Sequence, residues 1–193
     1  DIKDSLEVGV DGLIAPMVES GFGLKKFIDG VDSIYKNMGV HLSINIETQQ
    51  AVENLEEILE LGSGIIDNIT VGRTDLSASY FDSKITPDSD FIFGLLEEIG
   101  NKVSRSGMKM TVGGSLSKKS TERFGQNSKK WPGLIERLET RKVILPTKIM
   151  LENKNCIAEA LRFEELYILS KKEINDLFME SETARLTRLK MRS

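Results

Sequence analysis

Two acidic side chains stand where they could share one divalent cation. Glu47 follows an apolar run that ends at Ile46, and Asp75 comes shortly after a second run that ends at Val71. The two acids are 28 residues apart, close to the length of one strand–helix repeat. Mg²⁺ or Mn²⁺ is often held by only one or two carboxylates, with water and substrate oxygens completing its shell. We therefore take Glu47 and Asp75 as candidate metal ligands, and such a metal could polarise a carbonyl and stabilise an enolate.

Each of these carboxylates also has a structural alternative. Asp75 stands before a Leu-Ser-Ala-Ser stretch and could cap a short helix. Glu47 could pair with a basic residue, or cap a helix that begins near Gln49. Arg141 could likewise pair with nearby Glu139. The spacing alone leaves the metal pair and the caps both open.

Further residues near the same predicted strand ends could contact a ligand. Arg73 could bind a carboxylate or a phosphate, or lie on the surface. Gly113 and Gly114 could let a ligand approach the backbone, or simply turn the chain. His41 falls at the start of its strand, away from this chemistry, and Cys156 is expected to be buried rather than nucleophilic.

The elements that position these residues alternate along the chain. Apolar periodicity and glycine stops predict helices that alternate with five strands. Strands joined by helices pair in parallel, and functional groups then gather at the carboxyl ends of the strands. An open doubly wound sheet and part of a (β/α)₈ barrel both fit, and no G-x-G-x-x-G or P-loop supports nucleotide binding. The predicted strands are 11–18, 40–46, 65–71, 108–112 and 142–145, and the main helices are 20–38, 49–61 and 88–106.

Composition excludes several classes of protein. The 193 residues are 39% hydrophobic and 29% charged, an ordinary globular balance, and the net charge of −4 gives no reason to expect a nucleic-acid partner. One cysteine excludes an internal disulfide framework. No apolar run reaches the ~20 residues that span a bilayer, and the first residues do not form a signal peptide. We expect a soluble cytoplasmic protein that has no membrane partner.

Two regions are expected. Residues 1–150 hold the alternating elements and the candidate site, and residues 151–193 form a helical C-terminal extension. From about residue 156 no strand pattern occurs, and one or two amphipathic helices are predicted. Their expected buried positions are Ile157, Leu161, Ile168, Leu169, Leu177 and Phe178.

Three motifs in order resemble the HpcH/HpaI aldolase/citrate lyase family. An I-E-T ends one strand at residues 46–48, and a G-x-x-D-L-S-A follows the next at residues 72–78. The sequence GMKMTVGGSLS comes later, and the opening IKDSLEVGVDGLIAPMVES is similar to the family's preceding helix and strand. The resemblance covers about residues 2–120 and continues more weakly through ETRKVILP.

The resemblance implies a (β/α)₈ barrel with Mg²⁺ or Mn²⁺ on Glu47 and Asp75. It implies a carbon–carbon lyase, aldolase or citrate lyase-like, that acts through a metal-stabilised enolate of a 2-oxo acid or an acyl-thioester. Backbone N–H groups around Thr74 and Asp75 would hold the substrate carboxylate. The terminal helices would contact a neighbouring subunit, so a homo-oligomer is expected. Arg73 is the candidate catalytic residue, and the candidate substrate-binding residues are Gly72, Arg73, Thr74, Gly113 and Gly114.

The chain departs from the family pattern in two ways. It matches only about the last five of eight strand–helix units, so it would be a fragment or be completed by further chain. Arg73 stands at a loop position that often carries proline or another small residue. Two other functions therefore stay open: a barrel-derived metal-binding or scaffold protein without turnover, and a phosphoenolpyruvate-type phosphotransferase.

Overall fold

The computed structural model describes residues 1–36 and 38–191, which form an α/β fold around one six-stranded sheet. The strands lie side by side in sequence order. The first five pair in parallel and the last pairs antiparallel with the fifth. Parallel neighbours follow from the helical connections, which return the chain to the same edge. The strands are β1 (Gly12–Ala15), β2 (His41–Ile46), β3 (Asn68–Gly72), β4 (Lys109–Gly113), β5 (Arg137–Glu139) and β6 (Ile144–Pro146).

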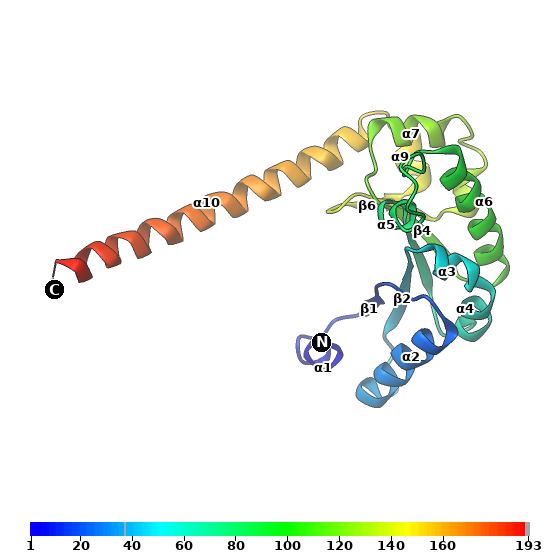
Figure 1. The fold of residues 1–193 in the computed structure, drawn as a ribbon, viewed down its shortest axis with the longest axis horizontal. Coiled ribbons are helices and arrows are strands. Elements are labelled where there is room, and N and C mark those ends of the chain that lie inside the picture. The colour runs from blue at the N-terminus through cyan, green and yellow to red at the C-terminus, as the bar shows by residue number, and fades with distance from the viewer. Residues whose placement is uncertain (37, 192–193) are drawn as a thin grey trace.

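Helices cover one face of this sheet, with α2, α4 and α6 lined up along its outside (Figure 1). Ile44, Ile46, Ile69 and Val71 of the strands are buried in one hydrophobic core together with the apolar faces of these helices. The helices are α1 (Ile2–Glu7), α2 (Gly21–Tyr35), α3 (Gln49–Glu53), α4 (Leu55–Gly62), α5 (Arg73–Ala78), α6 (Asp90–Arg105), α7 (Lys118–Gly125), α8 (Trp131–Leu134), α9 (Thr147–Glu152) and α10 (Cys156–Lys190).

The opposite face of the sheet is polar. Side chains alternate between the two faces of a strand, and the register aligns Asn45 with Thr70 and Thr70 with Thr111 on this second face. Thr111 donates to the Asn68 side-chain oxygen at 3.0 Å, and the Asn68 amide donates to Thr70 at 3.2 Å. The described strands form an open sheet rather than a closed barrel.

The predicted alternation of strands and helices is confirmed, but of the predicted fifth strand only Ile144 and Leu145 are in a strand, and its expected parallel pairing is wrong. Residues 142–145 were expected to form the last parallel strand, whereas β5 is at Arg137–Glu139 and β6 runs antiparallel to it. The four residues between them are too few for a parallel crossover and allow only a hairpin. The helix expected over 49–61 is also interrupted, because α3 ends and α4 begins at Asn54, whose amide donates to the Glu19 carbonyl at 2.7 Å.

A single long helix, α10, occupies the tail, where one or two amphipathic helices were expected. Cys156 and Ile157 are buried, as expected. The other expected buried positions are wrong, because α10 leaves the body of the chain after its first turns (Figure 1). Within the described residues, no helix is both long and apolar enough to cross a membrane. The wrongly expected side chains, Leu161, Ile168, Leu169, Leu177 and Phe178, are 41 to 67% exposed.

Candidate functional site

The carboxyl ends of β2 to β5 surround a pocket of about 580 Å³. Parallel strands bring residues that follow them to one rim, whatever their distance in sequence. The first turns of α10 close one side of the pocket through Leu161 and Glu164. The polar residues of the rim that line it include Glu47, Thr74, Asp75, Ser115, Glu139 and Arg141.

Glu47 and Asp75, predicted as a pair, line this one pocket. The structure contradicts both capping alternatives. Thr48 caps α3, accepting from the Ala51 N–H at 3.2 Å, and Gly72 is the N-cap of α5, which places Asp75 inside its first turn. Among residues 1–36 and 38–191, neither carboxylate has a hydrogen bond or a cationic partner. Both acids therefore face the pocket unneutralised.

Two glycines make room for the acidic side chains of the rim. A Cβ on Gly72 would lie 2.4 Å from Glu47 Oε1, and a Cβ on Gly113 would lie 2.5 Å from Glu139 Oε1. Gly72 and Gly113 are partners in the β3–β4 register. Glu47 and Glu139 therefore lie over neighbouring strands on the polar face of the sheet, each across a residue without a side chain.

Glu139 is a third pocket carboxylate, which the sequence indicated only as a partner for Arg141. Burial raises the pKa of Glu139, and the negative charge of Glu47 raises it further. The two causes act in the same direction, because burial and a neighbouring negative charge both disfavour the ionised carboxylate. In the described chain Arg141 forms no ion pair with Glu139, although both residues line the pocket.

The expectation that the Arg73 side chain contacts a ligand is not supported by its position. Arg73 is 0% exposed and is absent from the pocket lining. Nε donates to the Gly113 carbonyl at 3.0 Å, and another guanidinium nitrogen donates to the Gly114 carbonyl at 2.8 Å. A third donates to Asp88 at 2.8 Å, and burial lowers the pKa of Arg73 more than Asp88 raises it. Its donors are thus used to join the β3 and β4 rim loops to the segment before α6.

The remaining predicted residues stay at the rim. Thr74 and Ser115 join their loops by a 2.9 Å hydrogen bond between hydroxyl groups. Gly114 has φ +81°, and a Cβ there would lie 2.5 Å from the Thr74 backbone nitrogen. Only glycine fits this close approach, so the role of Gly114 is to let the two loops meet, and its backbone also lines the pocket.

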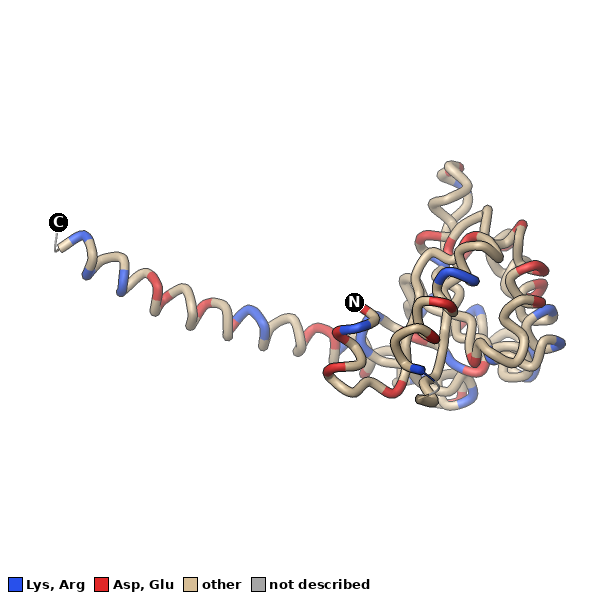
Figure 2. Tube along the Cα trace, turned by 90° about the horizontal axis from the view of Figure 1, so that it is seen from below, with Lys and Arg blue, Asp and Glu red and all other residues tan. Residues whose placement is uncertain are grey.

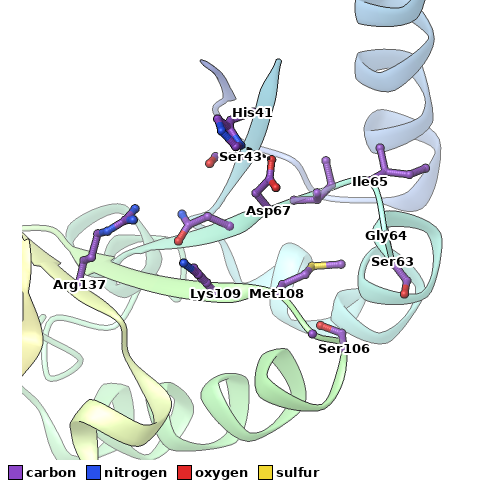
Figure 3. A pocket seen from close by; sticks show the side chains of 13 residues that line it. His41, Ser43, Ser63, Gly64, Ile65, Asp67, Ser106, Met108, Lys109 and Arg137 are labelled. Carbon is purple, nitrogen blue, oxygen red and sulfur yellow. Dashed lines mark hydrogen bonds and ion pairs between the residues drawn. The ribbon is translucent and has the colours of Figure 1, made fainter. Parts of the chain in front are cut away.

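A second cavity of about 750 Å³ opens at the other end of the strands. His41 and Asp67 come from strand starts there, 3.3 Å apart, with Lys109 and Arg137 nearby (Figure 3). The prediction that His41 lies away from the rim is confirmed. This cavity lacks the paired free carboxylates, and it lies at the end of the strands where parallel α/β folds rarely place their chemistry.

The donor chemistry of the rim fits a hard divalent cation. Glu47 and Asp75 offer carboxylate oxygens that no cation pairs with in the described part of the chain, and Mg²⁺ commonly keeps several waters beside one or two such ligands. No cluster of three or more His, Cys, Asp or Glu residues arranged to hold a metal occurs in the part of the chain that the structure describes. A site here would therefore be completed by water and substrate oxygens.

Alanine at Gly72 is expected to weaken Mn²⁺ binding by about tenfold or more, because its Cβ displaces the Glu47 carboxylate. The φ of −88° at Gly72 suits alanine, so the backbone need not change. Gly113→Ala is the matched control, since it displaces Glu139 instead. Calorimetric titration of both variants with Mn²⁺ checks this. Equal losses of Mn²⁺ affinity in the two variants would refute the expectation that Glu47 matters more than Glu139 for metal binding.

Comparison with known proteins supports the resemblance. Residues 1–94 match the family model described as HpcH/HpaI aldolase/citrate lyase. The match includes the motifs at residues 46–48 and 72–78 and ends before Gly113 and Gly114. A search of curated protein sequences found no match.

Solved structures share the fold at low sequence identity. RipC from Yersinia pestis aligns at 15% identity and a TM-score of 0.59, over 79% of this chain and 68% of that one. The HpcH/HpaI aldolase from Desulfitobacterium hafniense DCB-2 aligns at 15% identity and a TM-score of 0.54, over 72% of this chain and 60% of its own. Citrate synthase SbnG aligns at 14% identity and a TM-score of 0.53, over 91% of this chain and 69% of that one. The chain thus spans about two thirds of the length of these proteins.

The family profile and the shared fold agree with the motifs from which the resemblance was first drawn. Residues 1–94 therefore carry the sequence pattern of the HpcH/HpaI aldolase/citrate lyase family, and most of the chain shares the fold of a solved structure described as an HpcH/HpaI aldolase.

Proposed function

We propose that this chain forms part of a Mg²⁺- or Mn²⁺-dependent carbon–carbon lyase that acts on a 2-oxo acid or an acyl-thioester through an enolate. The observation that carries the proposal is the presence of Glu47 and Asp75 in one rim pocket, where neither has a cationic partner among the residues that the structure describes. Family membership supports an aldolase or citrate lyase type of chemistry.

Glu47 and Asp75 would hold the metal, which when bound supplies positive charge against the enolate oxygen. Burial raises the pKa of Glu139, and the negative charge of Glu47 is a second cause. Glu47, Asp75 and Glu139 line one pocket, so a bound cation would also reduce the repulsion between their carboxylates.

The chain's own groups would bind and orient the substrate. The backbone N–H groups of Thr74 and Asp75 lie in the first turn of α5, where a helix offers them no acceptor. Arg141, rather than Arg73, is the arginine whose guanidinium is available to a substrate carboxylate. In the cleavage direction a base removes the proton of the substrate hydroxyl group, and a carbonyl forms at that carbon as the carbon–carbon bond breaks. The electron pair of the broken bond enters the enolate, and protonation at carbon releases the 2-oxo acid or the acyl-thioester.

We place the described sheet within a larger (β/α)₈ barrel. The polar face of Asn45, Thr70 and Thr111 and the open edge at β1 fit a barrel interior to which more strands are added. The share of each neighbour that the chain covers is consistent with this arrangement.

Enolate formation can be measured directly. The full chain with Mn²⁺ or Mg²⁺ is expected to speed exchange of the methyl protons of pyruvate with deuterium in D₂O, followed by NMR, and chelation should abolish the effect. A parallel sample with acetyl-CoA distinguishes the acyl-thioester substrate. Metal binding with no exchange above that of metal alone would overturn the lyase and favour a non-catalytic metal-binding protein.

A further inference from the structure

The amino-end cavity, the space of about 750 Å³ around His41, Asp67, Lys109 and Arg137, lies on the polar face of the sheet. The register sets Arg137 of β5 beside Thr111 of β4, two residues after Lys109. Alternate residues of a strand share a face, so Lys109 and Arg137 point to the same side. Spacings of about 3.3 Å per residue and about 4.8 Å between strands put their Cα atoms on the order of 8 Å apart. Both long side chains can therefore reach one ligand.

These two cations have no partner in the described part of the chain. Lys109 and Arg137 extend from the starts of neighbouring strands into the cavity (Figure 3). Neither side chain has a hydrogen bond or an ion pair with another described residue. The acidic residues of α10 do not neutralise them, because after its first turns this helix extends clear of the body in two perpendicular views (Figures 1 and 2). The cavity thus holds positive charge that is available to an anion.

The acidic residue of the described lining, Asp67, is already engaged. One of its carboxylate oxygens accepts the Leu42 N–H at 2.8 Å and lies 3.3 Å from His41 Nδ1. Figure 3 shows Asp67 beside His41, whereas Lys109 and Arg137 lie on the strands that follow. Two cations against one acid leave the described lining with a net positive charge, even with the histidine neutral.

The rim pocket at the other end of the strands has the opposite charge. Among the described residues that line it, four acids face one cation, Arg141. A small anion is therefore attracted to the amino-end cavity and repelled from the metal-free rim pocket. The four acids of the rim pocket are Glu47, Asp75, Glu139 and Glu164.

We propose that the amino-end cavity binds the phosphate group of a small phosphorylated molecule through Lys109 and Arg137. The planar guanidinium matches two phosphate oxygens, and the lysine ammonium acts as a point charge on the remaining ones. A phosphate monoester has nearly two negative charges at neutral pH, which two cations neutralise, whereas one carboxylate would leave a cation unpaired. This site lies at the opposite end of the strands from the rim, and it does not depend on the proposed lyase activity.

The rest of the lining fits the body of such a molecule. The hydroxyl groups of Ser43 and Ser63 line the cavity and form no hydrogen bond with another described residue. Ile65 and Met108 add apolar surface beside them. The volume lies within the range of about 300–1,000 Å³ that is usual for small-molecule sites. In the barrel proposed above, the cavity would form the amino end of the interior.

Amide NMR of the full chain without added metal tests the proposal. Titration with inorganic phosphate at constant ionic strength and pH 8, where phosphate is a dianion, should give saturable shifts. The largest shifts are expected at Lys109, Arg137 and His41, and acetate should bind at least about tenfold more weakly because it has one charge. An absence of saturable shifts at these residues, or equal affinity for acetate, would overturn the proposal.

Charge-removing variants measure the contribution of each cation. Lys109→Gln and Arg137→Gln should each weaken phosphate binding by about tenfold or more, since each removes a charge-assisted contact. Lys119→Gln is the matched control, because it removes the same charge from an exposed position of α7 outside both cavities. Arg141→Ala tests the rim and should leave the affinity unchanged. Equal losses in Lys119→Gln, or a loss in Arg141→Ala alone, would refute a phosphate site in the amino-end cavity.

Discussion

Glu47→Gln and Asp75→Asn are each expected to weaken Mn²⁺ binding by about 100-fold or more. Each substitution replaces a charged carboxylate with a neutral amide of the same shape, so packing is preserved. Loss of an outer-sphere partner alone weakens metal sites by about 10- to 100-fold, and these side chains are proposed to contact the ion directly. Calorimetry or paramagnetic resonance with Mn²⁺ measures the affinity, with and without pyruvate.

The control for this pair is Glu60→Gln, which removes one negative charge from the exposed side of α4, outside both cavities. It separates a lost ligand from a change in net charge, and its affinity should stay close to that of the parent. Neither capping loss nor helix loss confounds the test, because Thr48 caps α3 and Gly72 caps α5. Unchanged affinity in both Glu47→Gln and Asp75→Asn would show that the metal assignment is wrong.

Arg73→Ala is expected to destabilise the chain by about 3–5 kcal/mol, because it removes one member of a buried ion pair. Asp88 is only 17% exposed and would lose its cation, while the Gly113 and Gly114 carbonyls would lose their donor. Total stabilities of about 5–15 kcal/mol make this a large fraction. Urea unfolding followed by circular dichroism measures it.

Two further variants distinguish a structural Arg73 from a ligand-binding one. Arg73→Lys should not restore stability, since one ammonium cannot reach the acceptors that a guanidinium contacts. Arg141→Ala, at an exposed arginine of the same rim, should change stability by less than about 0.5 kcal/mol and act instead on substrate binding. If the Arg73→Ala protein is fully stable but has lost substrate affinity, Arg73 binds the substrate and its structural role is refuted.

The order of elements and the two metal-ligand candidates were predictable because they depend on local patterns. Apolar periodicity marked the helices, and an acid after each of two successive strands must reach the same rim in a parallel sheet. The predicted bounds of helices and strands were less accurate where a competing local interaction decided them. Asn54 divides one predicted helix, and the hairpin between β5 and β6 places the last parallel strand about five residues before the predicted one.

By itself, the amino-acid sequence determined the α/β class, the family resemblance and the placement of Glu47 and Asp75, because strand ends and motif spacing are written along the chain. Only the tertiary structure decided the burial of Arg73, the position of Glu139 and the exposure of α10. Arg73 is buried because carbonyls from β4, 40 residues away, and Asp88 converge on it. Glu139 faces Glu47 because the glycines of β3 and β4 lie side by side. The apolar residues of α10 are exposed because nothing else in the described chain reaches them, and such long-range proximity leaves no local mark in the sequence.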